Sequence, residues 1–274
     1  MAECDALIQV IDAAGTTDIE GNPTGIKATK EQAIEQALAE VEFLTGELDA
    51  WILGLVKDGW SRGARRIQAE GVKGFTQFLQ ERLSGLGATN QICQRSFDAF
   101  AQQHQDMTSP WDWSDEVLML LASSIRKHLF PIFIAGNKAD LAPEGVLEHL
   151  QSVLPTFTPC SAETELALRQ AGKAGFITYV AGDTTFNLSE KQQMSEAQQK
   201  GLSVLAERVE KLRGTGLIKL LDQVLFDELQ RIVVYPVQDE SQWTDGDGNV
   251  LPDALVVHDG TPVSYTHLRA HETA

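Results

Sequence analysis

Residues 130–140 read Phe-Pro-Ile-Phe-Ile-Ala-Gly-Asn-Lys-Ala-Asp, and this stretch decides the fold class. Its first part, residues 130–135, is an apolar run of the length of a strand, as expected for a parallel strand that is buried on both faces. Its second part begins with glycine and is polar, as in a loop that follows a strand. The stretch therefore predicts a strand of an α/β core.

A second strand of the same core is predicted near the start of the chain. Residues 6–11 (Ala-Leu-Ile-Gln-Val-Ile) are almost wholly apolar and end in Asp12 before a loop that contains glycine. Buried parallel strands have this composition. Residues 16–28 contain several glycines and an Asn-Pro pair, so we expect them to form a loop.

The segment between these strands, residues 29–129, is predicted to be helical. Thr29 and Gln32 have the spacing of a capping box. The apolar residues that follow recur at steps of three and four, which suits helix–helix packing. Residues 61–86 repeat the pattern after a short Asp58-Gly59 link, and an antiparallel helical hairpin is therefore expected.

Two more helices complete this predicted coiled-coil-like insertion. One covers about residues 90–103. The other begins after Ser114, where Asp115 and Glu116 suit the positive end of a helix dipole. A plain helical bundle would not explain the strands on either side of the segment.

Beyond residue 140, helices are predicted over 143–152 and 163–173, with a short strand or loop at 156–159 between them. Ser195 and Gln198 form a second capping box, which begins a helix that ends near residue 212 before Gly214-Thr215-Gly216.

The hydrophobic pattern changes from that of helices to that of strands after a last predicted helix, residues 217–230. Residues 232–237 and 255–257 have the composition of strands and flank a polar turn at 244–249. We therefore expect a small β-containing domain to begin near residue 231.

The strongest chemical signal is Asn137-Lys138-Ala139-Asp140, directly after the apolar strand. An ionised Asp140 can accept two hydrogen bonds, from N1–H and from the exocyclic amine of guanine. Adenine has no such pair of donors and would leave the carboxylate unpaired. The stem of Lys138 can lie along the base, and Asn137 can tie the loop to its neighbours. The alternative is that Asp140 caps the helix that begins near residue 143.

Ser161 and Ala162 are the second signal. They begin a predicted helix about twenty residues after Asp140. Small residues there let the backbone N–H of Ala162 approach the carbonyl oxygen of guanine. An ordinary helix cap is the alternative for this pair alone, but the order and spacing after residues 137–140 favour guanine recognition.

The sequence lacks the Gly-x-x-x-x-Gly-Lys-Ser/Thr loop that surrounds nucleotide phosphates and supplies a hydroxyl ligand for Mg²⁺. Asp12-Ala13-Ala14-Gly15 matches the Asp-x-x-Gly pattern of a magnesium loop. Only eleven residues precede Asp12, however, so we interpret it as part of a turn that ends a strand. We predict no catalytic residue and no metal ligand in this chain, and little or no hydrolysis by it.

Composition narrows the classes of partner. A net charge of −17 argues against broad binding to DNA or RNA backbone. No run approaches the ~20 apolar residues that cross a bilayer. Three dispersed cysteines fit a reducing cytoplasm better than a disulfide framework or a zinc site. A local basic cluster remains a candidate for ribosome contact, or a solvated helix face: Arg62, Arg65, Arg66 and Lys73.

Taken together, these residues resemble the archaeal-type YchF branch of the Obg-related GTPases. The stretches that carry the resemblance are VIDAAGTTDIEGNP at 10–23, IAGNKADLAPE at 134–144, PCSAETELALR at 159–169, GTG at 214–216 and VVYPVQDESQWTDGDGNVLPDALVV at 233–257. The resemblance implies a P-loop-type G domain with a helical (coiled-coil) insertion and a β-grasp TGS domain. It also implies GTP as ligand, Mg²⁺ bound by the full-length parent only, and ribosome or rRNA as partner.

The same resemblance implies a division of the chain. Residues 1–28 and 130–230 would belong to the G domain, 29–129 to the insertion and 231–261 to the start of the TGS domain. We expect truncation at both ends, with the phosphate-binding parts upstream of Met1. Residues 262–274 read like a translated sequencing adapter and are expected to be a non-native tail.

Two other functions stay open at this point. The chain could be a non-enzymatic module that binds ribosome or RNA through its helices. It could also be a relative that prefers ATP, as many proteins of this branch do, although the intact residues 137–140 favour GTP.

Overall fold

The computed structural model describes residues 4–18, 21–25, 27–104, 109–189, 194–237, 239, 241–244, 247–250 and 254–262. The chain divides into two compact units, Met1–Leu217 and Ile218–Ala274, and each is described by itself.

The first unit is built on a parallel sheet of three strands, in the order β1 (Leu7–Asp12), β2 (Ile132–Asn137) and β3 (Phe157–Pro159). The predicted α/β class is confirmed. Strand β2 extends two residues further than the apolar run, because Gly136 and Asn137 pair with the last two residues of β1. The register aligns Asp12 with Asn137, so both side chains reach the same edge of the sheet.

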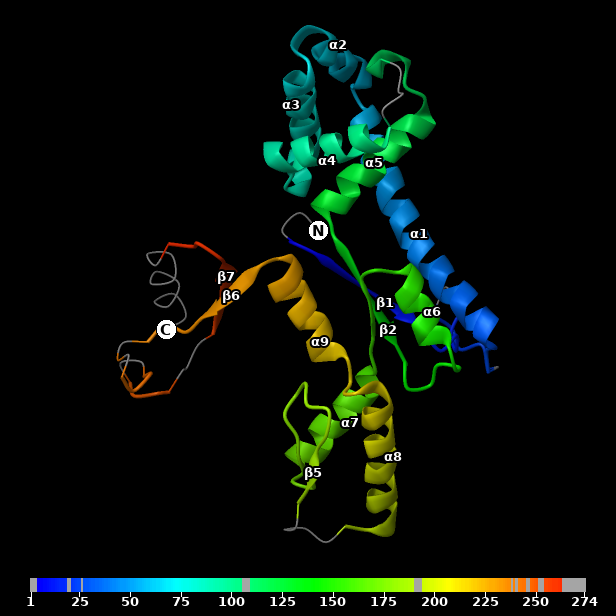
Figure 1. The fold of residues 1–274 in the computed structure, drawn as a ribbon, viewed down its shortest axis with the longest axis vertical. Coiled ribbons are helices and arrows are strands. Elements are labelled where there is room, and N and C mark those ends of the chain that lie inside the picture. Colours follow the sequence, from blue (N-terminus) through cyan, green and yellow to red (C-terminus); the bar gives the residue numbers. More distant parts are fainter. Residues whose placement is uncertain are drawn as a thin grey trace. The chain divides into compact units, whose positions relative to one another are not determined.

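Helices α1 (Lys30–Lys57) and α6 (Val146–Val153) cover one face of the sheet (Figure 1). Ile11, Ala33, Val146, Leu150 and Phe157 are buried together there. The predicted capping box at Thr29 and Gln32 is present and fixes the start of α1. This layer holds the strand ends in place for the site described below.

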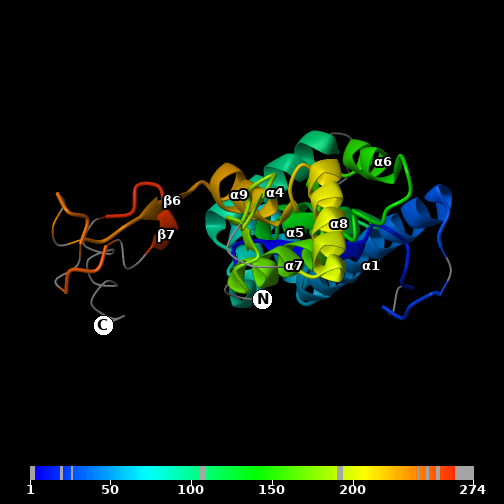
Figure 2. The ribbon, with the colours of Figure 1, turned by 90° about the horizontal axis from the view of Figure 1, so that it is seen from below.

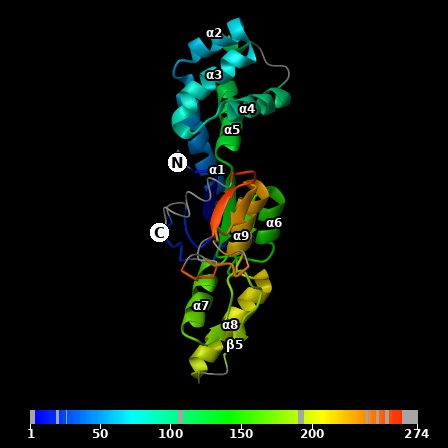
Figure 3. The same ribbon diagram turned by 90° about the vertical axis from the view of Figure 1, so that its left-hand side faces the viewer.

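The far half of α1 belongs to a helical cluster that also contains α2 (Trp60–Glu70), α3 (Val72–Leu83), α4 (Asn90–Gln103) and α5 (Asp115–Leu129). Two short 3₁₀ turns, Ser84–Leu86 and Pro110–Asp112, connect them. Figure 3 shows α2 to α5 gathered in one group. The core of the cluster is aromatic and aliphatic: Phe75, Phe78, Leu79, Phe100 and Leu121 are all buried.

Two details of the helical prediction are wrong. The expected single helix over 61–86 is broken at Gly71, whose φ of 66° is a left-handed value that ends α2 before α3 begins. The expected hairpin is also present only in part: α1 contacts α3, but it packs mainly along α5, and α2 packs on α3. Helices 90–103 and the one after Ser114 lie where the sequence placed them.

The sheet leads into α7 (Ala162–Lys173), a small antiparallel hairpin of β4 (Ile177–Thr178) and β5 (Asn187–Leu188), and α8 (Glu196–Leu212). The hairpin is too short to leave a periodic signal, so the sequence does not predict it. Helix α8 packs on α7 around Leu168, Leu202 and Val209 (Figure 2). Its predicted capping box at Ser195 and Gln198 is present.

Near the boundary of the two units, α9 (Leu217–Asp222) continues as a π-helical segment, Gln223–Glu228. Together they form the predicted helix 217–230, which ends two residues earlier than expected. Strands β6 (Arg231–Val234) and β7 (Leu255–His258) form the expected antiparallel pair. The tail predicted at 262–274 lies outside the described residues except for residue 262. Among the described helices, none combines the length and the apolar character that a membrane span requires.

Candidate guanine-recognition site

The carboxyl edge of the parallel sheet brings the predicted site residues together. Asp12, Asn137 and Pro159 end the three strands, and the loops that follow them meet at this edge. Ligands of open parallel sheets bind beyond the carboxyl ends of the strands. The loop of residues 137–140 and the start of α7 are therefore in the position that a ligand site requires.

Backbone hydrogen bonds fix the 137–140 loop. The N–H of Ala139 donates to the carbonyl of Cys160 over 3.0 Å, and the N–H of Leu141 donates to the carbonyl of Lys138 over 2.9 Å. Lys138 has a left-handed φ of 59°, an uncommon value for a residue with a side chain. The side-chain oxygen of Asn137 accepts the N–H of Ala162 at 3.1 Å, so Asn137 ties this loop to the next one.

Ser161 connects α7 to Asp140. Its buried hydroxyl lies 2.7 Å from Oδ1 of Asp140 and 2.8 Å from the hydroxyl of Thr164. Because the carboxylate can only accept, Ser161 donates to Asp140 and accepts from Thr164. Ser161 makes no side-chain capping bond to α7, and α6 begins after Gly145 rather than at Asp140. The two helix-cap alternatives therefore do not describe these side chains.

The Asp140 carboxylate is almost completely covered. Its side chain is 2% exposed, and Nη1 of Arg208 on α8 lies 3.1 Å from Oδ2. That contact is an ion pair, but the guanidinium N–H does not align as a hydrogen bond, and Oδ2 accepts none. Lys211, one turn further along α8, donates to the backbone carbonyl of Asp140 at 3.3 Å.

Lys138 reaches across the sheet edge to Asp12. Its ammonium lies 2.9 Å from Oδ2 of Asp12 and 2.7 Å from the hydroxyl of Thr16. Asp12 also accepts hydrogen bonds from the backbone of Ala14 and Thr16 and from the hydroxyls of Thr16 and Thr17. These bonds close the turn that the sequence predicted at Asp12.

The protonation of Asp12 follows from these contacts. Burial alone would raise the pKa of Asp12, but the hydrogen bonds from Thr16, Lys138, Thr17 and Ala14 outweigh it and lower the pKa to about 2. Asp12 is therefore an anion at neutral pH, and it holds the end of Lys138 beside the loop.

A segment just before α9 supports the Ser161 turn. The carbonyl of Thr215 accepts the N–H of Ser161 at 2.9 Å, and the Thr215 hydroxyl donates to Glu165 at 2.6 Å. A Cβ on Gly216 would lie 1.9 Å from the carbonyl oxygen of Pro159, and its φ is 80°. Only glycine allows this close approach, so the Gly-Thr-Gly stretch secures the end of β3.

The neighbouring cavity is acidic. A depression of about 380 Å³ is lined by Asp12, Asp18, Glu40 and Lys138, among other residues. Burial, with the charge of Asp12, raises the pKa of Glu40. Carboxylates would repel phosphate there. Within the described ranges, no group of three or more His, Cys, Asp or Glu residues could hold a metal ion, and we assign no magnesium ligand.

A buried parallel sheet with loops of this kind at its carboxyl edge is the arrangement of nucleotide-binding α/β folds. Residues 135–239 match the model of the family described as Obg-like GTPase YGR210-like, G4 motif-containing domain. A crystal structure of a GTP-binding protein from Pyrococcus horikoshii superposes with a TM-score of 0.66 at 31% identity, over 98% of this chain and 69% of that one.

Two curated relatives agree with this match. An uncharacterised GTP-binding protein of Methanocaldococcus jannaschii is 36% identical over 99% of this chain, and one of Schizosaccharomyces pombe is 27% identical over 95%. The chain spans 65% and 63% of their lengths, slightly less than two thirds. This chain belongs to the family of Obg-like GTP-binding proteins.

The structure adds three residues to the site that sequence reasoning did not assign: Asp12, Arg208 and Lys211. Asp12 could have been found, because the two strands were predicted to be parallel and their ends therefore meet. Arg208 and Lys211 lie about seventy residues beyond the loop that they contact, as the sequence separation of 71 between Lys211 and Asp140 shows. No local pattern in α8 marks them.

Proposed function

We propose that this chain recognises the base of a guanine nucleotide through residues 137–140 and 161–162. Asp140 selects guanine by accepting from N1–H and from the exocyclic amine. Lys138 lies along the base, and Ala162 donates its N–H to the carbonyl oxygen of the base. The observation that carries the proposal is the buried Oδ2 of Asp140, a carboxylate oxygen that accepts no hydrogen bond.

The arrangement around Asp140 supports this assignment. Ser161 holds Oδ1 at 2.7 Å, and the backbone bonds of residues 139–141 fix the direction of the carboxylate. A preorganised acceptor of this kind gains most from a ligand that brings two N–H donors. Because Ala162 already donates to Asn137, base binding requires a small rearrangement of that amide.

Replacing Asp140 by asparagine tests the proposal. The amide keeps the size of the carboxylate but donates on one side, so it should favour xanthine, whose C2 carries an oxygen in place of the amine. We expect Asp140→Asn to weaken guanosine binding about tenfold or more and to strengthen xanthosine binding, as measured by ligand-detected NMR titration. Unchanged guanosine binding would remove Asp140 from the site and refute the assignment.

For the whole protein we propose GTP hydrolysis, in the YchF branch of the family and in the cytoplasm. The family match and the names of the relatives support the GTP ligand. Catalysis and Mg²⁺ binding would require residues other than those of the base site. Adenosine provides the test of the ATP alternative: adenosine binding tighter than that of guanosine, with no effect of Asp140→Asn, would favour an ATP-preferring relative.

We also propose that residues 29–129 are an insertion in the G domain (residues 1–28 and 130–230), and that residues 231–261 begin a TGS domain. The pairing of β1 with β2 supports the first part, because the two strands are neighbours although the helices separate them in sequence. The β6–β7 hairpin supports the second part.

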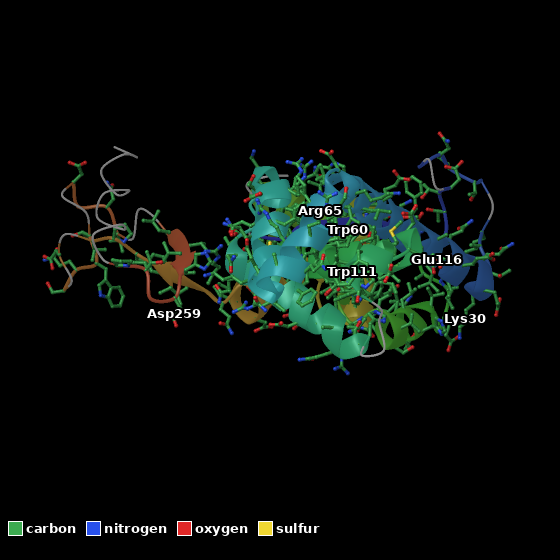
Figure 4. The ribbon with its side chains drawn as sticks, turned by 90° about the horizontal axis from the view of Figure 1, so that it is seen from above. Lys30, Trp60, Arg65, Trp111, Glu116 and Asp259 are labelled. Atoms are coloured by element: carbon green, nitrogen blue, oxygen red, sulfur yellow. The ribbon has the colours of Figure 1, made fainter. Side chains whose placement is uncertain are left out.

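Ribosome or rRNA binding by the helical cluster is a second candidate function. A cavity of about 370 Å³ at this cluster is lined by residues that include Trp60, Arg65 and Trp111 (Figure 4). Trp111 and Arg65 are exposed, and Trp60 is half-buried; an aromatic side chain beside basic ones suits single-stranded RNA. Arg62 and Arg65 are exposed, whereas Arg66 pairs with Glu81 at 2.9 Å.

Co-sedimentation with ribosomes at several salt concentrations tests this second function. Charge reversal at Arg62 and Arg65 should abolish salt-sensitive binding. Reversal at Arg66, whose charge Glu81 already compensates, should have a smaller effect. Binding that ignores all three substitutions would exclude the cluster as the contact surface.

A further inference from the structure

The chain itself covers the side of Asp140 that a base must reach. A carboxylate that waits for a ligand would face solvent, yet the Asp140 side chain is only 2% exposed. Ser161 occupies Oδ1, and the Arg208 guanidinium lies against Oδ2 at 3.1 Å. A guanine base therefore cannot pair with Asp140 until Arg208 moves.

The chemistry of Arg208 explains why it can occupy this place. A guanidinium presents N–H donors from one plane and pairs with both oxygens of a carboxylate. The N1, C2 and amino groups of guanine are the same guanidine unit within a ring. Arg208 and guanine thus offer similar donors to one acceptor, and they compete for Asp140.

The contact between Arg208 and Asp140 is poorly aligned, so guanine could replace Arg208 there. The guanidinium neutralises the charge, but Oδ2 of Asp140 accepts no aligned hydrogen bond. A buried acceptor without a partner is unfavourable, and guanine would supply the missing donor. The Arg208 side chain is 27% exposed, so its long stem can turn the charged end into water.

We propose that Arg208 is an internal competitor that occupies Asp140 until guanine displaces it, and that it thereby sets the affinity of the site for the base. This inference rests on the proposed role of Asp140 in base recognition. Helix α8 thus acts on the site directly. Lys211 lies on the same helix but contacts the backbone carbonyl of Asp140, not the carboxylate.

Guanosine titrations of the 274-residue chain, followed by ligand-detected NMR, test the competition. Guanosine carries no phosphate, so a change of protein charge does not affect it through long-range attraction. Arg208→Ala should bind guanosine about threefold or more tightly than the unaltered chain, the effect expected when a partly exposed ion pair no longer competes. Arg208→Lys keeps the charge but loses the planar donors, and should fall between the two.

Lys200→Ala is the matched control, because it removes a positive charge from the exposed first turns of the same helix without freeing the carboxylate. Its guanosine affinity should stay unchanged. If Arg208→Ala binds guanosine equally well or more weakly, Arg208 orients Asp140 and the competition is refuted. Equal tightening by Lys200→Ala also refutes it.

Adenosine separates this inference from the proposed function. If neither the unaltered chain nor Arg208→Ala prefers guanosine to adenosine, both ideas fail together. If the unaltered chain prefers guanosine and Asp140→Asn abolishes the preference, base recognition stands and the Arg208 result decides the competition alone. Should Arg208→Ala fold poorly, Arg208→Lys gives the same decision.

Discussion

Two buried carboxylates at the same edge of the sheet have opposite surroundings. Asp12 accepts hydrogen bonds from five donors, four of which meet at Oδ2. Asp140 accepts one, from Ser161, and its Oδ2 faces an unaligned guanidinium. The saturated carboxylate has no capacity left for a ligand, so its role is to hold the loops. The unsaturated one retains an acceptor, which is what a binding residue needs.

The largest difference between Asp12 and Asp140 should appear in the free energy of unfolding that is lost when each is replaced. Asp12→Ala removes the acceptor of five hydrogen bonds and leaves the Lys138 ammonium without its carboxylate, so we expect the free energy of unfolding to fall by about 3 kcal/mol. Asp140→Ala should cost less, about 1 kcal/mol, since it removes one hydrogen bond and a misaligned pair. Urea denaturation of both variants measures the difference, and equal losses would contradict the comparison.

The pH dependence of stability gives the next largest effect. The pKa of Asp12 falls from 3.8 to about 2 on folding, so its contribution is complete above pH 4 and is lost as the pH falls through 2. The shift corresponds to about 2 kcal/mol. In Asp12→Asn this part of the acid dependence should disappear, as measured by urea denaturation between pH 2 and pH 5. A variant with the acid dependence of the unaltered chain would show that other carboxylates are responsible.

This comparison also explains how far the sequence could predict the molecule. The two apolar strands, the helix starts at Thr29, Ser114 and Ser195, and the β6–β7 pair were predictable because short-range patterns determine them. The break at Gly71 was not, since a helical period continues on both sides of it.

The candidate site divides in the same way. Residues 137–140 and 161–162 were predictable because each group is contiguous and has a characteristic order. The structure brings them together through the Asn137–Ala162 and Asp140–Ser161 hydrogen bonds. The Arg208 contact depends on how α8 packs across α7, and no pairwise spacing in the sequence reports that packing.

A third carboxylate tests whether a carboxylate that accepts several hydrogen bonds has a structural role in general. Glu165 is buried and accepts from Arg169, Tyr179 and Thr215 at 2.6–2.7 Å. Burial alone would raise the pKa of Glu165, but these bonds, led by that of Thr215, lower it. Thr215→Val keeps the shape and removes one donor, so it should reduce the free energy of unfolding by about 1 kcal/mol. Ser203→Ala on the exposed face of α8 is the control and should change it little. If Thr215→Val left the free energy of unfolding unchanged, a full set of hydrogen-bond donors around a carboxylate would not indicate a structural role.

The smallest effect is expected at the pair that we regard as exchangeable. Removing one partner of a fully buried ion pair costs about 3–5 kcal/mol, because the other charge stays buried. Arg208 is different, since its side chain is 27% exposed and its loss opens Asp140 to water. Arg208→Ala should therefore lower the free energy of unfolding by at most about 1 kcal/mol, measured by the same urea denaturation. A decrease in the free energy of unfolding as large as that of Asp12→Ala would mean that the Arg208–Asp140 pair is structural. Asp12 and Asp140 would then both have structural roles.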